Sequence, residues 1–563
     1  MRTHRDSRAR APIPLGGAAR PWPGRGWRKT TSRAGCALLA LLLLGAPEGA
    51  RPLRAQATPR AVRDAGASPS SPVSPRFDSL DAQVEALMRE WSVPGLSLAV
   101  VVNGETRVLK GYGLRELARP EPVDEHTVFA LASTTKAFTA AALGILVDEG
   151  RLSWDDLVAT RLGGFRLGDS AIARTLTIRD ILSHRSGYDR HEALWHAFGY
   201  TRGEVVERLG RLRPSWGLRE RFGYQNLMYS LAGQIVESVS GSSWDRFVEE
   251  RILRPLRMSR SATGAQGLSA LGNVATPHAR GRDGVVSVVP RRDADNIGPS
   301  GSMISSAADM AEWLRFNLAS GVAGGRRILS EGVVRAMQAP QVRIRPEDDI
   351  VVGLMSPGGE GVSYGMGWYV HEYFGHTVVE HPGGVEGMSP IVVLVPDMRA
   401  GIVILTNISM PTAVQFALRG EILDALLGIQ GLDWPAQTRA ALQRLSGGFA
   451  PARAARGTPG AAPAPPTLPL PSYAGSYAHE AYGNIQVMSG ERGLAVRFGQ
   501  RGTVSPLIHL GGDEFLMVWQ SPLFPPERCR FELDQAGRIR SAVFTGPAGF
   551  TGMGTFQRRE EGR

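Results

Sequence analysis

The chain has 563 residues, of which 43% are hydrophobic and 21% charged, and its formal net charge is +11. Residues 1–54 alone carry eleven arginine and lysine residues against two acids, so the rest of the chain is close to neutral. This distribution argues against an extended basic face for nucleic acid, and the apolar content predicts a large buried core.

The first 57 residues are typical of a signal peptide. A basic stretch precedes the apolar run AGCALLALLLLGA and the small residues Ala55 and Ala57, after which we expect cleavage. The run is shorter than the roughly 20 residues of a membrane-spanning helix, so no span is expected after cleavage. We therefore expect export to the periplasm or the extracellular space. Since Cys36 falls in the removed segment, Cys529 is left alone and no intrachain disulfide is expected.

Composition divides the remainder into two domains. Residues 58–76 are rich in Pro, Ser and Ala and predict a disordered leader. A second Pro/Ala-rich segment lies further along the chain. We therefore expect residues 431–471 to comprise the end of a helix and a linker. The domains that these segments delimit are expected at 77–430 and 472–558.

The larger domain begins with a helix that ends near Trp91, followed by a hairpin with Asn103-Gly104 as its turn. Helical stretches occupy the middle of the domain. Three strand-like runs lie within 376–407, and the helical segment 411–428 follows them. Because strands lie at both ends, we expect an α/β fold of the α+β type, in which an antiparallel sheet is flanked by helices and joined to a helical subdomain.

The last domain alternates apolar and polar residues in short runs separated by glycine turns. This pattern predicts a small all-β barrel or sandwich.

The chain contains only three lysines, Lys29, Lys110 and Lys136, among 64 basic residues. Lys136 lies three residues after Ser133, at the start of the apolar helical segment AFTAAALGIL, so both side chains share one helix face. A desolvated lysine can act as a base, which arginine cannot. The pattern therefore predicts a nucleophilic Ser133 activated by Lys136, although Ser-x-x-Lys alone is a weak signal.

Two further segments carry residues suited to the same site. Tyr224 and Asn226, in RFGYQNLMYS, are two apart and can face one cleft, and a phenol beside a lysine can have a lowered pKa. A buried tyrosine and a helix-capping asparagine are the alternative interpretation.

The segment VVEHPGGVEG places His381 and Gly383 on one face of a strand. Gly383 and Gly384 allow close approach of a substrate, and an amide there can complete an oxyanion hole with the amide of Ser133. Pro382 lacks an N–H group and predicts an edge strand. A turn histidine in a glycine-rich loop is the alternative.

The order Ser-x-x-Lys, Tyr-x-Asn, His-x-Gly resembles the serine β-lactamase and penicillin-binding protein superfamily. The likeness is greatest to its class C-like branch, which includes D-alanyl-D-alanine carboxypeptidases, D-aminopeptidases and esterases. It extends to TIRDILSHRSGYDRH and IGPSGSMISSAADMAEWLRF and covers about 77–430. The last domain resembles the lipocalin-like C-terminal domain of some members.

The resemblance implies that Ser133 is acylated, that Lys136 and Tyr224 act as coupled bases, and that Asn226 orients Lys136 and the substrate carbonyl. His381 takes the place of the lysine in the Lys-Thr-Gly motif of β-lactamases. Because an imidazole has an ordinary pKa of about 6.5, we expect carboxylate recognition to be weaker or pH-dependent, and β-lactam hydrolysis not to be the main activity.

The expected function is that of an exported serine hydrolase of the D,D-carboxypeptidase or esterase type, acting on an ester or D-amino-acid peptide that is small or cell-wall derived. It implies no cofactor, no metal and no nucleic acid. A zinc site is disfavoured, since His191 and His196 are five residues apart and a helical zinc motif needs four. A catalytically silent ligand or peptidoglycan sensor with the same fold is the alternative.

Overall fold

The structure, a computed structural model, describes residues 77–559 apart from 78, 282, 350, 357–360, 410–412, 449–463, 522–523 and 547–551. The predicted signal peptide and leader, and much of the predicted linker, lie outside the described residues.

The larger domain is built on an eight-stranded antiparallel sheet in the order β2-β1-β14-β13-β12-β11-β10-β9. Its first two strands and its last six come from opposite ends of the domain, as the sequence predicts. The strands are β1 Gly95–Val102, β2 Glu105–Gly113, β9 Val342–Arg343, β10 Ser363–Tyr364, β11 Tyr369–Tyr373, β12 His376–Pro382, β13 Ile391–Val395 and β14 Ala400–Thr406.

The hairpin of β1 and β2 turns at Asn103-Gly104 as predicted, and both residues have positive φ, the backbone conformation that such a two-residue turn requires. All eight residues of β1 are buried. Alternate residues point to opposite faces of a sheet, so Leu96 and Leu98 enter one apolar core while Ala99 and Val101 enter the other. This explains why the strand reads as an uninterrupted apolar run.

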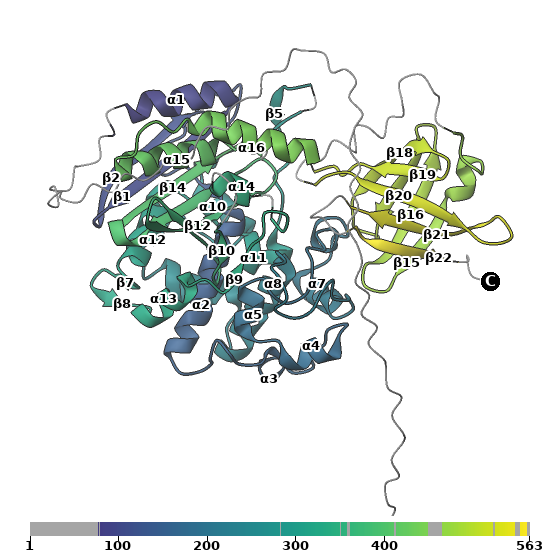
Figure 1. Ribbon diagram of the computed structural model, residues 1–563, viewed down its shortest axis with the longest axis horizontal. Coiled ribbons are helices and arrows are strands. Elements are labelled where there is room, and N and C mark those ends of the chain that lie inside the picture. The colour runs from purple at the N-terminus through teal and green to yellow at the C-terminus, as the bar shows by residue number, and fades with distance from the viewer. Residues whose placement is uncertain are drawn as a thin grey trace, which may run out of the picture. The chain divides into compact units, whose positions relative to one another are not determined.

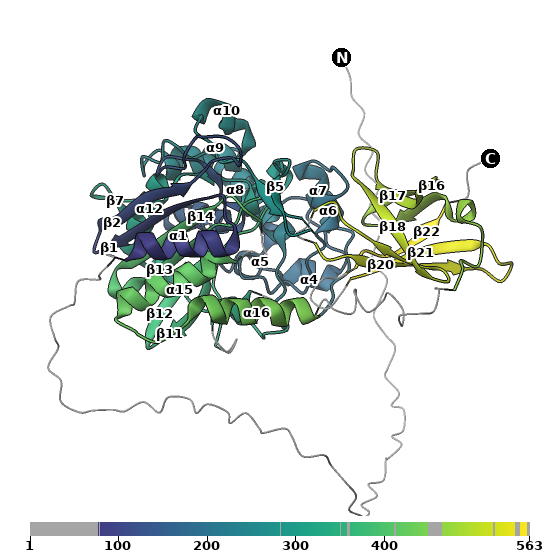
Figure 2. The ribbon, with the colours of Figure 1, turned by 90° about the horizontal axis from the view of Figure 1, so that it is seen from above.

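Helices cover both faces of the sheet (Figures 1 and 2). One face packs against α15 (Val414–Leu427), with α1 (Leu80–Trp91) and α16 (Trp434–Gly448) beside it. The other packs against α12 (Ala307–Leu318). The helix α16 is a separate element, where the sequence predicted only the end of a helix before the linker.

The helical subdomain lies between the two strand-forming ends of the domain and packs around α2. Its helices are α2 Thr135–Asp148, α3 Val158–Arg161, α4 Ser170–Thr175, α5 Ile178–Leu182, α6 Ala193–His196, α7 Arg202–Leu209, α8 Asn226–Ser240, α9 Trp244–Val248, α10 Leu268–Leu271, α11 Gly298–Gly301 and α13 Glu331–Gln338. The short helix α14 (Val352–Met355) lies between β9 and β10 and packs against α16 instead. Three two-stranded ribbons accompany them, β3 Phe129–Ala130 with β6 Ile304–Ser305, β4 His278–Arg280 with β5 Val286–Val288, and β7 Val322–Ala323 with β8 Arg326–Arg327.

The prediction that Pro382 marks an edge strand is wrong, because β12 lies inside the sheet between β13 and β11. Pro382 is the last residue of β12 and pairs with Ile391 of β13, while β11 reaches only as far as Glu380. No strand therefore lies on the second side of Pro382, where its missing N–H would interrupt a ladder.

A buried ion pair joins α15 to the strand that carries His381. The guanidinium of Arg419 donates to both carboxylate oxygens of Glu380, at 2.9 and 2.6 Å, and His371 lies 2.8 Å from the same carboxylate. Arg419 and Glu380 are both fully buried. Since a buried charge is costly without its partner, this contact ties the position of β12 to the helix beneath it.

The last domain is a closed barrel in which each of eight antiparallel strands pairs with the next along the chain. Its strands are β15 Gly475–His479, β16 Gly483–Gly490, β17 Gly493–Phe498, β18 Val504–Gly511, β19 Glu514–Met517, β20 Glu527–Leu533, β21 Ile539–Thr545 and β22 Gly554–Arg558. Buried and exposed residues alternate along β16 and β20, which accounts for the pattern in the sequence. Cys529 is buried in β20 as a free thiol.

Within the described residues, no helix combines the length and the apolar character needed to cross a bilayer.

Candidate active site

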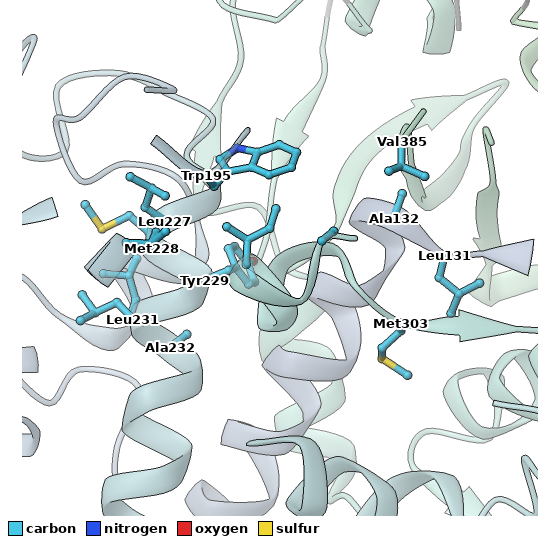
Figure 3. Packing of buried hydrophobic residues seen from close by; sticks show 14 of the residues in the cluster. Leu131, Ala132, Trp195, Leu227, Met228, Tyr229, Leu231, Ala232, Met303 and Val385 are labelled. Atoms are coloured by element: carbon cyan, nitrogen blue, oxygen red, sulfur yellow. The ribbon is translucent and has the colours of Figure 1, made fainter. Parts of the chain in front are cut away.

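Ser133 lies in a single 3-10 turn, Ala132–Thr134, that leads directly into α2, so the predicted position at a helix start is correct. Ala132 has a φ of 45°, in the left-handed region that L-residues rarely adopt. Figure 3 shows Leu131 and Ala132 at the start of α2, with Leu227 and Leu231 on the neighbouring helix α8. The turn leaves Ser133 partly exposed while its neighbours are buried.

Lys136 lies one turn further along α2 and is completely buried. Its amine is 3.2 Å from the Ser133 hydroxyl oxygen, 2.7 Å from the side-chain oxygen of Asn226 and 2.9 Å from the carbonyl oxygen of Ser300. Burial holds the pKa of Lys136 well below its usual range; Glu192 opposes this shift and Arg190 adds to it.

The two oxygen contacts decide which way the lone pair of a neutral Lys136 points. A neutral amine has two N–H groups and one lone pair. The carbonyl of Ser300 and the side-chain oxygen of Asn226 are acceptors, so each takes one N–H. The remaining lone pair faces Ser133, whose hydroxyl can donate to it. The geometry therefore presents a base to the serine.

Tyr224 packs its ring against the same amine, with Lys136 Nζ 4.8 Å from the ring centroid. Its other neighbours are His184, at 4.3 Å between ring centroids, and Arg190, at 4.6 Å. The sequence suggested a lowered phenol pKa, but burial raises the pKa of Tyr224 above its usual value, although Ser133 and Arg190 act in the opposite direction. A lysine that is itself neutral supplies no charge to lower it, so Tyr224 carries its proton.

Glu192 is a residue of this site that the sequence analysis did not identify. Its carboxylate accepts two hydrogen bonds from the Asn226 amide, at 3.1 and 3.2 Å, and one from Arg190 at 3.0 Å, and Trp195 also donates to it. Because Asn226 donates to Glu192, its oxygen is turned towards Lys136. Glu192 lies in the segment RHEALWHAF, and no pattern within that segment indicates contact with Asn226.

His381, at the end of β12, is almost fully buried. Its Nδ1 lies 2.7 Å from the carbonyl oxygen of Pro382, and its Nε2 lies 2.9 Å from the Tyr364 hydroxyl. In the neutral ring Nδ1 donates to that carbonyl and Nε2 accepts from the phenol. Burial, with Lys136 acting in the same direction, lowers the pKa of His381 to about 3. This imidazole is therefore neutral at physiological pH, which favours the weaker carboxylate recognition expected from the sequence over a pH-dependent one.

The two glycines after Pro382 have different surroundings. The amide of Gly383 donates to the carbonyl of Pro390 at 2.7 Å, so it is not free for an oxyanion. A Cβ on Gly383 would lie 2.8 Å from the carbonyl oxygen of Leu131 and 3.0 Å from Ala132 Cβ. Gly383 is therefore a point of close packing against the Ser133 turn. Gly384 is exposed, and its amide has no backbone partner within the described chain.

The two histidines of RHEALWHAF do not converge on a common point. His191 Nδ1 lies 2.8 Å from the Tyr482 hydroxyl, while His196 Nε2 lies 2.6 Å from Glu386. In the part of the chain that the structure describes, no cluster of three His, Cys, Asp or Glu side chains is arranged to hold a metal ion.

Comparison with known proteins agrees with this geometry. Residues 80–427 match the family described as Beta-lactamase, which is more than half of the chain. The chain belongs to the beta-lactamase family. The family domain contains the sheet, the helical subdomain and every site residue described above. Residues 460–557, which include all of the barrel strands except the last residue of β22, match a domain of unknown function, DUF3471.

Relatives of this beta-lactamase-family chain include Unguisins hydrolase ungD of Aspergillus violaceofuscus, 28% identical over 521 residues, with 84% of this chain and 89% of that protein covered. Penicillin-binding protein 4 of Amycolatopsis lactamdurans is 29% identical over 356 residues, with coverage of 62% and 89%. Among solved structures, the octameric penicillin-binding protein homologue from Pyrococcus abyssi has a TM-score of 0.55 at 21% identity, covering 85% of this chain and 99% of that one. That structural likeness shows the fold.

Proposed function

We propose that this protein is a serine hydrolase that forms an acyl-enzyme on Ser133 and cleaves an ester or a D-amino-acid peptide or amide. The observation that carries the proposal is the buried Lys136 amine, whose two acceptor contacts leave its lone pair facing the Ser133 hydroxyl 3.2 Å away. A catalytic base needs to be unprotonated and within hydrogen-bond reach of the proton it takes.

In the first step the Ser133 oxygen attacks the substrate carbonyl carbon while its proton passes to Lys136. The carbonyl oxygen gains negative charge and is bound by the amides of Ser133 and Gly384, aided by the start of α2. The bond to the leaving nitrogen or oxygen then breaks, and that atom receives a proton from Tyr224, which is protonated at rest. Tyr224 regains a proton from Lys136, and water releases the acyl group by the reverse sequence.

The neutral state of His381 supports an ester or peptide substrate over a β-lactam as the main one. His381 stands where β-lactamases carry a lysine, and its low pKa leaves no positive charge there to pair with a β-lactam carboxylate. A neutral imidazole suits a neutral group of the substrate better than an anion.

Intact-mass analysis after separate exposure to a fluorophosphonate and to a penicillin tests the proposal, with Ser133→Ala as the control. We expect a mass gain with the fluorophosphonate that is lost in the control. A stable penicillin adduct in addition would support the D-alanyl peptidase type. If protein shown to be folded gains mass with neither reagent, the proposal fails in favour of a ligand or peptidoglycan sensor.

Export is a separate part of the proposal. The N-terminal segment has the charge and apolar pattern of a signal peptide, and we expect the mature protein to begin after Ala57. N-terminal sequencing of the protein from the periplasmic or culture fraction of its own host tests this expectation, which uncleaved protein confined to the cytoplasm would contradict.

A further inference from the structure

A cavity that opens to solvent adjoins the catalytic groups. Glu192 and His191 of the hydrolase domain line one side, and Tyr482, Trp519, Phe524 and Glu527 of the barrel domain line another. Glu192 is also the residue that accepts from Asn226, so two hydrogen bonds lead from the cavity wall to the Lys136 amine. A group bound in this cavity would lie beside the reaction centre.

Specific contacts hold the two sides of the cavity together. The Tyr482 hydroxyl lies 2.8 Å from His191 Nδ1, and Tyr200 donates to the backbone carbonyl of Tyr482 at 2.7 Å. These residues are buried or nearly so. The cavity is therefore formed by both domains and is absent from either domain taken separately.

Aromatic rings form much of the wall. The rings of Trp519 and Phe524 are 6.2 Å apart at 65°, and Phe524 is 4.4 Å from the imidazole of His196. Ring faces carry partial negative charge, so a group of such rings attracts a cation as well as an apolar group.

Glu527 decides between these two kinds of ligand. It is only 7% exposed, and its Oε2 has no hydrogen-bond partner among the described residues. Burial raises the pKa of Glu527 to about 8, although the Met553 backbone and the Trp519 side chain donate to it, and no cation contributes. His191 Nε2 is a second buried polar atom without a partner in the described chain. A carboxyl buried among rings without a basic partner is costly, and a cationic ligand would remove that cost.

The other carboxylates near the cavity each have an arginine close by. Arg190 lies 3.0 Å from Glu192, and the charge of Arg292 helps to lower the pKa of Glu386. An entering cation would therefore meet one carboxyl that lacks a basic partner, that of Glu527.

We propose that this cavity binds a cationic amine of the substrate, held by the Glu527 carboxyl and by the faces of Trp519, Phe524 and Tyr482. The inference rests on the proposed function, because it names the substrate class of the same site. It makes the barrel domain part of the substrate-binding surface and gives the hydrolase a preference for basic substrates.

Binding in the absence of turnover tests the amine site by itself. Ser133→Ala protein is titrated calorimetrically with benzylammonium and with benzyl alcohol, which has nearly the same shape and no charge. We expect benzylammonium to bind at least about tenfold more tightly, and Glu527→Gln to remove this preference while leaving benzyl alcohol unaffected. Glu514→Gln, an exposed barrel carboxylate paired with Arg528, is the matched control and should change neither affinity. Equal binding of both compounds, or an unchanged preference in Glu527→Gln, overturns the inference.

Two ester substrates then identify where the amine lies on the substrate. One carries a free α-amine, as in a D-phenylalanine ester, and the other carries only a side-chain amine, as in an N-acetyl-D-lysine ester. For the ester whose amine reaches the cavity, we expect Glu527→Gln to lower kcat/KM at least tenfold. The same ester with that amine acetylated should show no such loss. If Glu527→Gln lowers kcat/KM for neither of the two esters, the inference is contradicted. Calorimetry uses the Ser133→Ala variant and therefore measures amine binding independently of acylation. If the amine binds there but the wild-type protein is never acylated on Ser133, the proposed function fails while the amine site stands.

Discussion

The Lys136 amine lies 2.7 Å from the side-chain oxygen of Asn226, although the two residues are 90 positions apart in the chain. Asn226 begins α8 and Lys136 lies in the first turn of α2, so the contact exists because these two helices pack side by side. Glu192, on the other side of Asn226, keeps the amide in the orientation that this contact needs.

Replacing Lys136 by methionine should abolish acylation while the fold is retained. Replacing Lys136 by arginine would keep a cation but remove the base. Because Lys136 is fully buried, however, the larger guanidinium would overpack the site. Methionine fills similar space without an amine. We expect the acylation rate to fall by about 10³-fold or more, because both the base and its orientation are lost. Stopped-flow labelling measures the rate, and circular dichroism checks the fold. A rate within tenfold of wild type would contradict the role given to the amine.

Replacing Glu192 by glutamine should shift the acidic limb of the pH profile to lower pH. Glu192 raises the pKa of Lys136, so removing its charge lowers that pKa further, and the amine stays neutral to a lower pH. The variant should then keep a larger fraction of its maximal kcat/KM as the pH falls. A drop in kcat/KM at every pH without a shift would mean that Glu192 acts only by placing Asn226. The exposed Glu85→Gln, which removes a surface charge paired with Arg89, should leave the limb unchanged.

Replacing Gly383 by alanine should impair catalysis through the Ser133 turn. The added Cβ would meet the Leu131 carbonyl oxygen at 2.8 Å, and backbone cannot move aside without moving Ser133. We expect a loss of about 1–3 kcal/mol in stability and about 10²-fold in acylation rate. Gly203→Ala is the matched control, since no heavy atom lies within 4 Å of its added Cβ. Thermal melts and labelling rates measure the two effects, and a wild-type rate in Gly383→Ala would contradict this account.

Buried histidines should make stability fall as the pH drops below about 6.5. Burial lowers the pKa of His191 to about 4, so between these two values the unfolded chain binds a proton that the folded protein does not. The contribution is complete above pH 6.5, is lost towards pH 4, and amounts to about 3 kcal/mol. Burial shifts the pKa values of His184 and His381 in the same direction.

Glu527 opposes this trend, because its raised pKa makes the folded protein bind the extra proton between about pH 4.5 and 8. The measurement is therefore the difference in unfolding free energy between wild type and His191→Gln across pH 4 to 7. We expect the variant to show the shallower decline. The exposed His126→Gln should follow the wild-type curve. Parallel curves for wild type and His191→Gln would show that His191 does not contribute.

Patterns within single segments were enough to predict much of this protein. The i, i+3 spacing of Ser133 and Lys136 places both on one face of a helix wherever that helix packs, and the structure has them in contact. The turn at Asn103-Gly104 and the three strands after residue 375 follow from local backbone preferences and apolar alternation in the same way.

Other features depend on how distant segments pack, which the pattern along one segment does not encode. Strand order places β12 inside the sheet, and therefore Pro382 away from an edge. Burial, a property of the assembled core, raises the pKa of Tyr224, where the sequence suggested a lowered one. It also lowers the pKa of His381 well below the ordinary value of an imidazole. Glu192 reaches Asn226, and the barrel residue Glu527 reaches the cavity beside it, through tertiary packing alone. Local spacing was thus enough to identify the reactive groups. Packing between distant segments determines their protonation states and the other residues that line the site, because burial and contacts arise only in the folded chain.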